Sequence, residues 1–271
     1  MKFDLIIGGV GGQGILSIAF VIDNSALKSG LYFKQSEVHG MAQRGGAVSS
    51  HLRIGSDPIF SDLVALGSAE MLMAVEPMEA LRYKDYLKRG GIVVSNIVPV
   101  INIPEYPEHK DLISGLLSFQ KLVLINADKI AKEASSPRAQ NMAILGAASP
   151  YLPLRQEIME EFIGILFSDK GDKLIQINLN AFRFGLANGR FFTACLEKRS
   201  DPTSVLELMD HLDSGAMKAE SASAWSKVLS SPIASELSAL FQSDPKRLFP
   251  SDPETANRIF IEGIKFLREN L

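Results

Sequence analysis

The fold is decided by residues 2–14, KFDLIIGGVGGQG. They begin as an apolar strand and end in a turn, where five of the last seven residues are glycine. An amphipathic helix pattern follows, with Ile15, Ile18, Ile22 and Ala26 on one face. A strand, a tight turn and a helix in this order leave free backbone N–H groups at a helix N-terminus. Such a place attracts anions, and phosphates above all.

The composition is typical of a folded protein with a sizeable core. Of the 271 residues, 46% are hydrophobic and 22% charged, so we expect one large domain or two modest ones. The formal net charge of −3 gives no pull toward nucleic acid, and no apolar run has membrane-spanning length. The first residues lack the pattern of a signal peptide, so a cytoplasmic location is expected.

The cysteine and histidine content limits the chemistry of this chain. Cys195 is the single cysteine, which excludes an intramolecular disulfide, a cysteine-ligated iron–sulfur cluster and a cysteine-rich zinc site. The four histidines are scattered, with no pair at helical spacing. We therefore expect no metal site, and a reducing compartment fits.

Strands alternate with helices through the first two-thirds of the chain. A helix is expected from Glu76-Pro77 to Lys88-Arg89, stopped by Gly90-Gly91. The pattern predicts an α/β fold with a largely parallel sheet and helices on both faces. Ligands sit beyond the carboxyl ends of the strands in such sheets, where the glycine turn lies. The expected strands are residues 3–7, 31–36, 47–54, 63–66, 92–94 and 121–126.

The chain becomes mainly helical after Pro150. Residues 197–204 are polar and contain Pro202, which is typical of a link between two units. We therefore expect an α/β domain over residues 1–195 and a helical C-terminal extension over residues 196–271. A last helix is expected to begin at residues 251–254 and to carry an apolar stripe of Ala256, Phe260, Ile264 and Leu267.

The glycine turn allows three interpretations. Gly9, Gly11 and Gly14 match the G-x-G-x-x-G pattern, and Gly12 belongs to the same turn. The turn can hold a phosphate or another anion, it can serve only close helix packing, or it can bind NAD or FAD. An acid at the end of the second strand would favour a dinucleotide, and Glu37 comes late for that role. The amide of Gln13 can donate to a ligand or brace the loop.

A second polar cluster covers residues 36–46, SEVHGMAQRGG, between two expected strands. Loops dense in polar side chains and glycine are often functional, so Ser36, His39, Gln43 and Arg44 are candidate binding residues. Arg44 can clamp a carboxylate or a phosphate, or it can pair with Glu37. His39 can act as an acid or base, or it can be structural.

Other motifs add little chemistry. The acids of residues 76–79 are interpreted as complements of the helix dipole. The sequence holds no serine nucleophile elbow and no lysine of a P-loop, so the catalytic residues are unknown. An anion cradle without a nucleophile or base suggests a chain that completes its chemistry with a partner.

These clusters together resemble the gamma subunit, or gamma domain, of the 2-oxoacid:ferredoxin oxidoreductases. The similarity is greatest to the beta subunit of indolepyruvate:ferredoxin oxidoreductase, and it covers roughly residues 1–190. The residues that carry it are 8–14 (GGVGGQG), 36–46 (SEVHGMAQRGG), 51–55 (HLRIG) and 76–83 (EPMEALRY).

The resemblance implies a subunit of an enzyme that decarboxylates a 2-oxoacid, here an aryl pyruvate, and forms an acyl-CoA. Thiamine diphosphate and iron–sulfur clusters are then held mainly by a larger partner subunit, and electrons pass to ferredoxin. It also implies that this chain is inactive alone. The glycine turn and the 36–46 cluster would face the partner or a phosphate of coenzyme A. The alternative is a free-standing nucleotide- or NAD-binding Rossmann-like protein.

Overall fold

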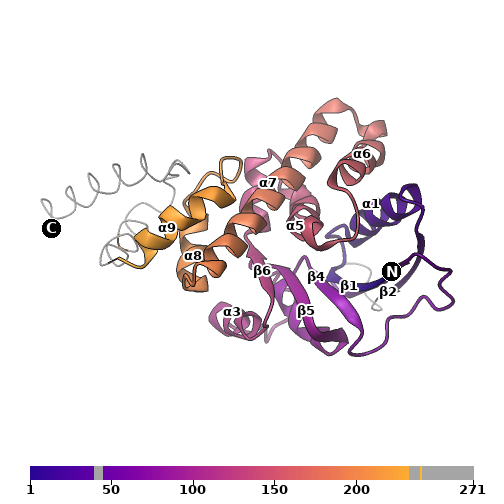
Figure 1. The fold of residues 1–271 in the computed structure, drawn as a ribbon, viewed down its shortest axis with the longest axis horizontal. Coiled ribbons are helices and arrows are strands. Elements are labelled where there is room, and N and C mark those ends of the chain that lie inside the picture. The colour runs from indigo at the N-terminus through magenta and orange to yellow at the C-terminus, as the bar shows by residue number, and fades with distance from the viewer. Residues whose placement is uncertain (40–44, 232–238, 240–271) are drawn as a thin grey trace, which may run out of the picture. The chain divides into compact units, whose positions relative to one another are not determined.

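The computed structural model describes residues 1–39, 45–231 and 239 (Figure 1). The chain divides into two units, Met1–Leu186 and Ala187–Leu271. The expected domain boundary after residue 195 stays a prediction. In the part of the chain that is described, no helix is long and apolar enough to cross a membrane.

The first unit contains a six-stranded sheet with the order β2-β3-β1-β4-β5-β6. Strand β3 pairs antiparallel with both β1 and β2, whereas β1–β4, β4–β5 and β5–β6 are parallel pairs. Only β3 of these six strands therefore runs against the others, which confirms the largely parallel sheet. The strands are β1 (Lys2–Val10), β2 (Tyr32–His39), β3 (Ala47–Gly55), β4 (Ala69–Ala74), β5 (Leu87–Asn96) and β6 (Leu122–Ile125).

Helices cover both faces of this sheet, as expected. A side chain on Gly9 would come 2.7 Å from Ile15 of α1, whereas one on its neighbour Gly8 would come 3.1 Å from Tyr83 after α2. Adjacent strand residues point to opposite faces, so α1 and α2 lie on opposite faces. We call these the α1 face and the α2 face. The helices of this unit are α1 (Ile15–Lys28), α2 (Pro77–Arg82), α3 (His109–Leu117), α4 (Ala127–Glu133), α5 (Gln140–Ala148), α6 (Gln156–Leu166) and the first part of α7 (Asp172–Glu197).

The strand predicted at residues 63–66 is wrong. These residues belong to the connection between β3 and β4, and Leu63 and Leu66 are exposed. The strand lies one step later, at Ala69–Ala74, where Met71 and Met73 are buried. Four apolar residues are too short a run to separate a strand from a loop that anchors one apolar side chain.

The helix predicted up to Lys88-Arg89 is also wrong in its second half. Helix α2 ends at Arg82, a 3₁₀ turn follows at Lys84–Tyr86, and β5 begins at Leu87. Gly90, with a φ of +75°, sits where the β4–β5 register shifts. The two glycines thus form an irregularity inside a strand instead of ending a helix.

The described part of the second unit is helical, with α8 (Pro202–Asp210) and α9 (Ala222–Leu229) after the end of α7. Pro202, which was expected in a link, is the first residue of α8. Asp201 caps that helix, since its carboxylate accepts the Ser204 N–H at 2.9 Å. The last helix expected from residues 251–254 lies outside the described residues.

The crossing of α5 and α7 gives a stability prediction. A Cβ on Gly146 would meet the backbone carbonyl of Phe182. We expect Gly146→Ala to lower the free energy of unfolding by about 2 kcal/mol or more, because the backbone cannot move away as a side chain can. Gly164→Ala is the matched control: Gly164 lies in α6 with open space around it, so the change should be neutral or stabilise by up to about 1 kcal/mol. Urea denaturation that gives equal losses for both variants would contradict this.

Asp23 of α1 gives a pH prediction. Its side chain is buried, its Oδ1 has no hydrogen-bond partner, and burial raises its pKa from 3.8 to about 7. The folded state therefore holds a proton that the unfolded chain releases near pH 4, so stability falls as the pH rises from about 4 to about 7. Asp23→Asn should remove this slope and stabilise the protein at pH 8 by about 2 kcal/mol. Thermal unfolding at pH 5 and pH 8 measures both effects, and an unchanged slope would contradict the prediction.

Candidate functional site

The glycine turn joins the carboxyl end of β1 to α1. Gly12 and Gly14 have φ angles of +102° and +77°, a region that side chains with a Cβ rarely adopt. Gly14 is also the N-cap of α1, and its carbonyl accepts from the Asn141 amide at 3.2 Å. The turn therefore needs glycine for its backbone shape as well as for close packing.

Gln13 braces this turn from inside. Its Oε1 accepts the Val10 N–H at 2.7 Å, and its Nε2 lies 3.5 Å from the Val75 carbonyl beyond β4. One side chain thus links the ends of two adjacent parallel strands. Gln13 was expected either to donate to a ligand or to brace the loop. These two contacts use both ends of its amide for bracing.

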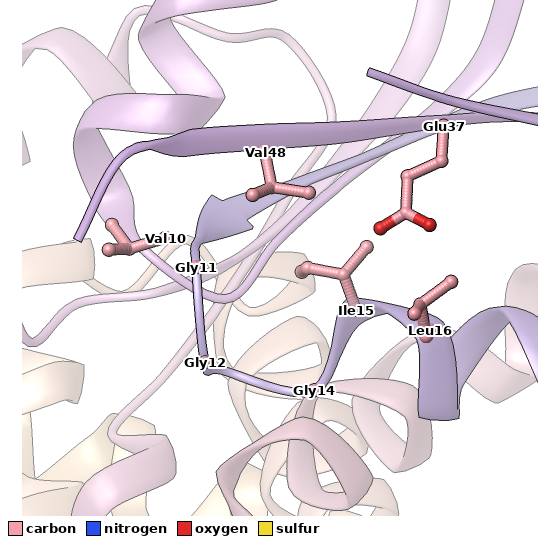
Figure 2. A pocket seen from close by; sticks show the side chains of 8 residues that line it. All are labelled: Val10, Gly11, Gly12, Gly14, Ile15, Leu16, Glu37 and Val48. Atoms are coloured by element: carbon pink, nitrogen blue, oxygen red, sulfur yellow. The ribbon is translucent and has the colours of Figure 1, made fainter. Parts of the chain in front are cut away.

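A pocket of about 270 Å³ lies against the turn (Figure 2). The Gly11 N–H is taken by the Gly46 carbonyl at 2.8 Å. The N–H groups of Gly12, Gly14, Ile15 and Leu16 have no partner among the described residues. Free amides at a helix N-terminus are donors for an anion. The pocket is lined by Val10, Gly11, Gly12, Gly14, Ile15, Leu16, Glu37 and Val48.

Glu37 places a carboxylate in the same pocket. Figure 2 shows it directed from β2 toward Ile15 and Leu16. The pocket therefore offers amide donors on one side and an acidic acceptor on the other, which suits a ligand with one anionic group and a hydroxyl or amine. The expected strand stopped at Ser36, which made Glu37 look late; β2 continues to His39. The alternation of Gln35 and Glu37 on one face is the signal that could have identified it.

The other candidate residues lie in different places. Ser36 pairs with His51 across the β2–β3 ladder and so faces away from the pocket that holds Glu37. His39 ends β2. Gln43 and Arg44 lie outside the described residues. Gly45, which follows them, accepts from the Asn102 amide at 2.6 Å. Together with the Gly11–Gly46 bond, this contact holds the end of the 36–46 cluster beside the glycine turn.

Buried carboxylates occupy the α2 side of the same sheet edge. Glu76 is fully buried, caps α2 through the Glu79 N–H at 3.1 Å, and accepts from the Tyr106 hydroxyl. The carboxylate of Glu79 pairs with Arg82 at 3.1 Å. Burial raises the pKa of Glu79, against the opposing effect of Arg82. These acids do more than complement a helix dipole, but their partners identify them as structural braces.

Asn96 completes this bracing at the end of β5. Its Nδ2 donates to the Val75 carbonyl at 3.2 Å and to Asp128 at 2.9 Å, while its Oδ1 accepts the Ala127 N–H at 3.0 Å. The ends of β4 and β5 and the start of α4 are thereby held together. In the described ranges, no three histidine, cysteine or acidic side chains cluster to hold a metal ion.

The glycine turn lies between β1 and β4, adjacent strands whose following helices cover opposite faces. This is the switch point at which open α/β sheets bind ligands. The fold is thus that of an α/β domain with a pocket at the switch point. The family model of pyruvate ferredoxin/flavodoxin oxidoreductase matches residues 4–188. The chain therefore belongs to this family, which confirms the resemblance seen in the sequence motifs.

Relatives and solved structures agree with this assignment. Indolepyruvate oxidoreductase subunit IorB of Thermococcus kodakarensis is 36% identical over 196 residues, which cover 68% of this chain and 95% of that subunit. The same subunit of Pyrococcus horikoshii is 34% identical, with the same coverage. The gamma subunit of a keto/oxoacid ferredoxin oxidoreductase from Geobacter sulfurreducens shares the fold, with a TM-score of 0.54 at 22% identity over 70% of this chain and 97% of that one.

Replacement of Gln13 tests the brace. Gln13→Ala should speed hydrogen exchange of the Val10 amide and lower the free energy of unfolding by about 1 kcal/mol, because a partly buried donor loses its acceptor. Gln13→Glu keeps an acceptor at that position and should preserve the protection of Val10. Equal exchange of the Val10 amide in Gln13→Ala and the unaltered protein would contradict the assigned role.

Proposed function

We propose that this chain is the small subunit of a 2-oxoacid:ferredoxin oxidoreductase that acts on indolepyruvate or a related aryl pyruvate and forms an acyl-CoA. The observation that carries the proposal is the family match over residues 4–188, which spans the first unit. The names of the relatives at 34–36% identity support the choice of indolepyruvate.

We place the redox and thiamine cofactors in a larger partner subunit. Cys195 cannot ligate an iron–sulfur cluster by itself, and it is buried, with a pKa raised to about 12 by burial. Gly171-Asp172 only starts α7 and lacks the Asn-rich continuation of a thiamine diphosphate motif. The residues present thus do not fit either group.

Relatives in which a matching domain is part of a longer chain support such a partner. The match to ketoisovalerate oxidoreductase subunit VorA of Methanothermobacter marburgensis covers 66% of this chain but only 35% of that subunit. A similar fold forms 31% of a 2-oxoglutarate:ferredoxin oxidoreductase chain from Magnetococcus marinus, solved with coenzyme A and succinyl-CoA bound (TM-score 0.57). A domain that occurs both alone and inside longer chains is expected to pack against the remainder of the enzyme.

For the glycine-turn pocket we propose a phosphate of coenzyme A as ligand. The free amides of Gly12, Gly14 and Ile15 would hold it, and the Glu37 carboxylate would accept from a hydroxyl of the same ligand. Gln43 and Arg44 remain candidate ligands by their position in the sequence. The alternative of a free-standing NAD-binding protein is not favoured, because the residues that contain the turn lie within the match to the oxidoreductase family.

Reconstitution tests the subunit assignment. The isolated chain should not oxidise aryl pyruvates, whereas mixing with the cluster-bearing partner should give activity that depends on coenzyme A and reduces ferredoxin. Activity of the chain alone would refute the partner requirement. Calorimetric titration of the isolated chain with NAD(P) should give no saturable binding, and saturable binding would support the alternative.

A charge placed in the pocket tests the ligand. Leu16 lines the pocket and is exposed, so Leu16→Glu adds a carboxylate beside the free amides without disturbing the core. It should raise the KM for coenzyme A in the assembled enzyme by about fivefold, because one like charge in a partly wet site costs about 1 kcal/mol. Leu27→Glu, on the same helix but outside the pocket, should leave the KM unchanged. Equal effects of both changes would contradict the site.

A further inference from the structure

Strand β2 is the last strand of the sheet on its side among the described residues. Its eight residues pair with β3 in an uninterrupted register, with neither a bulge nor a proline. In the part of the chain that the structure describes, no strand pairs with the outer side of β2. Proteins usually blunt such an edge with short strands, bulges, prolines or lysines. Of these, β2 carries Lys34, whose ammonium donates to the Phe60 carbonyl at 3.3 Å.

The α2 face of β2 is open to solvent beside this edge. Tyr32 and Val38 are each 51% exposed, and Lys34 between them is exposed too. All three have even numbers and so point to the same face of the strand. Two half-exposed apolar side chains thus flank a lysine on an uncovered strip.

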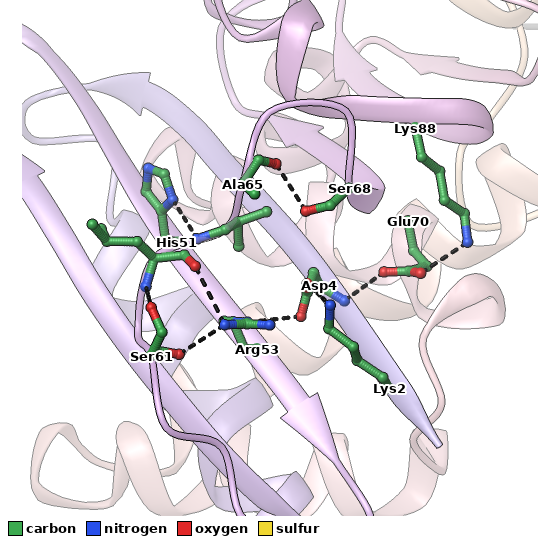
Figure 3. Close-up of polar contacts among 11 residues, drawn as sticks. Lys2, Asp4, His51, Arg53, Ser61, Ala65, Ser68, Glu70 and Lys88 are labelled. Carbon is green, nitrogen blue, oxygen red and sulfur yellow. Dashed lines mark hydrogen bonds and ion pairs between the residues drawn. The ribbon is translucent and has the colours of Figure 1, made fainter.

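A connection held by several hydrogen bonds carries a further apolar side chain next to this strip. Residues 56–68 lie over β3 and are fastened by buried or half-buried side chains (Figure 3). Nη1 of Arg53 donates to the Ser61 carbonyl at 3.0 Å, and its Nε is fixed by Asp4 at 3.0 Å. Nδ1 of His51 accepts the Val64 N–H at 3.1 Å, which requires a neutral ring. Burial lowers the pKa of His51 and favours this state.

Phe60 is presented by this connection and is 93% exposed. Its carbonyl accepts from Nζ of Lys34 at 3.3 Å, so the segment that carries it is tied to β2. Large apolar side chains on a fixed backbone lose little entropy when a partner covers them, which is typical of interface anchors.

We propose that a second copy of this chain docks here, with the two β2 strands paired antiparallel around a two-fold axis at Gln35. A two-fold axis perpendicular to the sheet leaves the two faces of the sheet unchanged. Residues that lie opposite each other must point to the same face, so their numbers are both even or both odd. Centred on Gln35, the register sets Tyr32 of one copy opposite Val38 of the other. It also sets Lys34 opposite Ser36 and Phe33 opposite Glu37.

The strand is self-complementary in this register. Because of the two-fold symmetry, the Tyr32–Val38 pair forms twice, once at each end of the paired strands. No two like charges lie opposite each other. The neighbouring register, centred on Ser36, would set Lys34 against Val38 and so oppose a charge to an apolar group. Phe60, whose carbonyl accepts from Lys34, lies on the connection next to this pairing. The larger subunit is the competing occupant of this edge.

A single cysteine tests the register. In Gln35→Cys the two new thiols face each other across the axis, at the Cα separation of a cross-strand pair, which permits a disulfide. Mild oxidation of the full chain should convert most of it to a covalent dimer, in isolation and within the assembled enzyme. Glu37→Cys is the matched control on the same face and should not cross-link. Cys195 is buried and should not react.

The mass of the isolated chain tests the surface. Light scattering should give twice the chain mass at about 50 µM, a concentration that favours a moderate dimer. Val38→Lys should give monomers, whereas Leu27→Lys, at an exposed leucine of α1, should leave the dimer intact. A monomeric native chain without cross-linking of Gln35→Cys in isolation or in the complex would overturn the proposal. Loss of binding to the larger subunit in Val38→Lys, without a dimer to disrupt, would overturn it in favour of that partner.

Discussion

The structure depends on the burial of β1 in the middle of the sheet, between β3 and β4, with helices on both faces. Because neighbouring strands and helices surround β1, the chain leaves the sheet only at the carboxyl end of this strand. There it turns in the space between α1 and α2. Gly8 and Gly9 lack side chains because the two helices approach from opposite sides. Gly12 and Gly14 turn the backbone through the left-handed region. The glycines of this segment therefore meet two requirements: close packing of helices on β1, and a left-handed backbone in the turn after it.

The same constraint produces the free amides of the site. A turn this tight cannot pair all of its N–H groups internally. The Gln13 side chain does not pair with them, because it contacts the Val10 N–H and the Val75 carbonyl instead. The donors that remain sit at the start of α1, close to the acidic acceptor Glu37. Around them, Glu76 and Asn96 hold the neighbouring strand ends at fixed positions. The strand ends are thus held at several points, and the N–H groups of Gly12, Gly14 and Ile15 have no partner within the described ranges.

Several features were visible in the sequence because their causes are local. Apolar runs of four to six residues, glycine turns and amphipathic helices identify the α/β fold, and the motif at residues 36–46 identifies the family. Local signals failed where two elements compete for the same residues. Residues 84–91 have helix-forming and helix-stopping residues, yet they lead into β5 because pairing with β4 and β6 buries Val93 and Val94. In the same way, Leu63 and Leu66 look like a strand, although only Val64 is buried.

The sequence by itself determined the strand–turn–helix unit, the helices on both faces and the place of the glycine turn at the start of α1, since these follow from residue type and short-range spacing. Only the tertiary structure decided which residues meet there. It set Glu37 in the pocket and Ser36 on the opposite face, because the register of β2 on β3 assigns each residue to a face. It also decided that Gly146 packs against α7 and that, in the described part of the chain, β2 is an edge strand. A side chain's face and its distant neighbours depend on strand register and helix packing, which no local pattern contains.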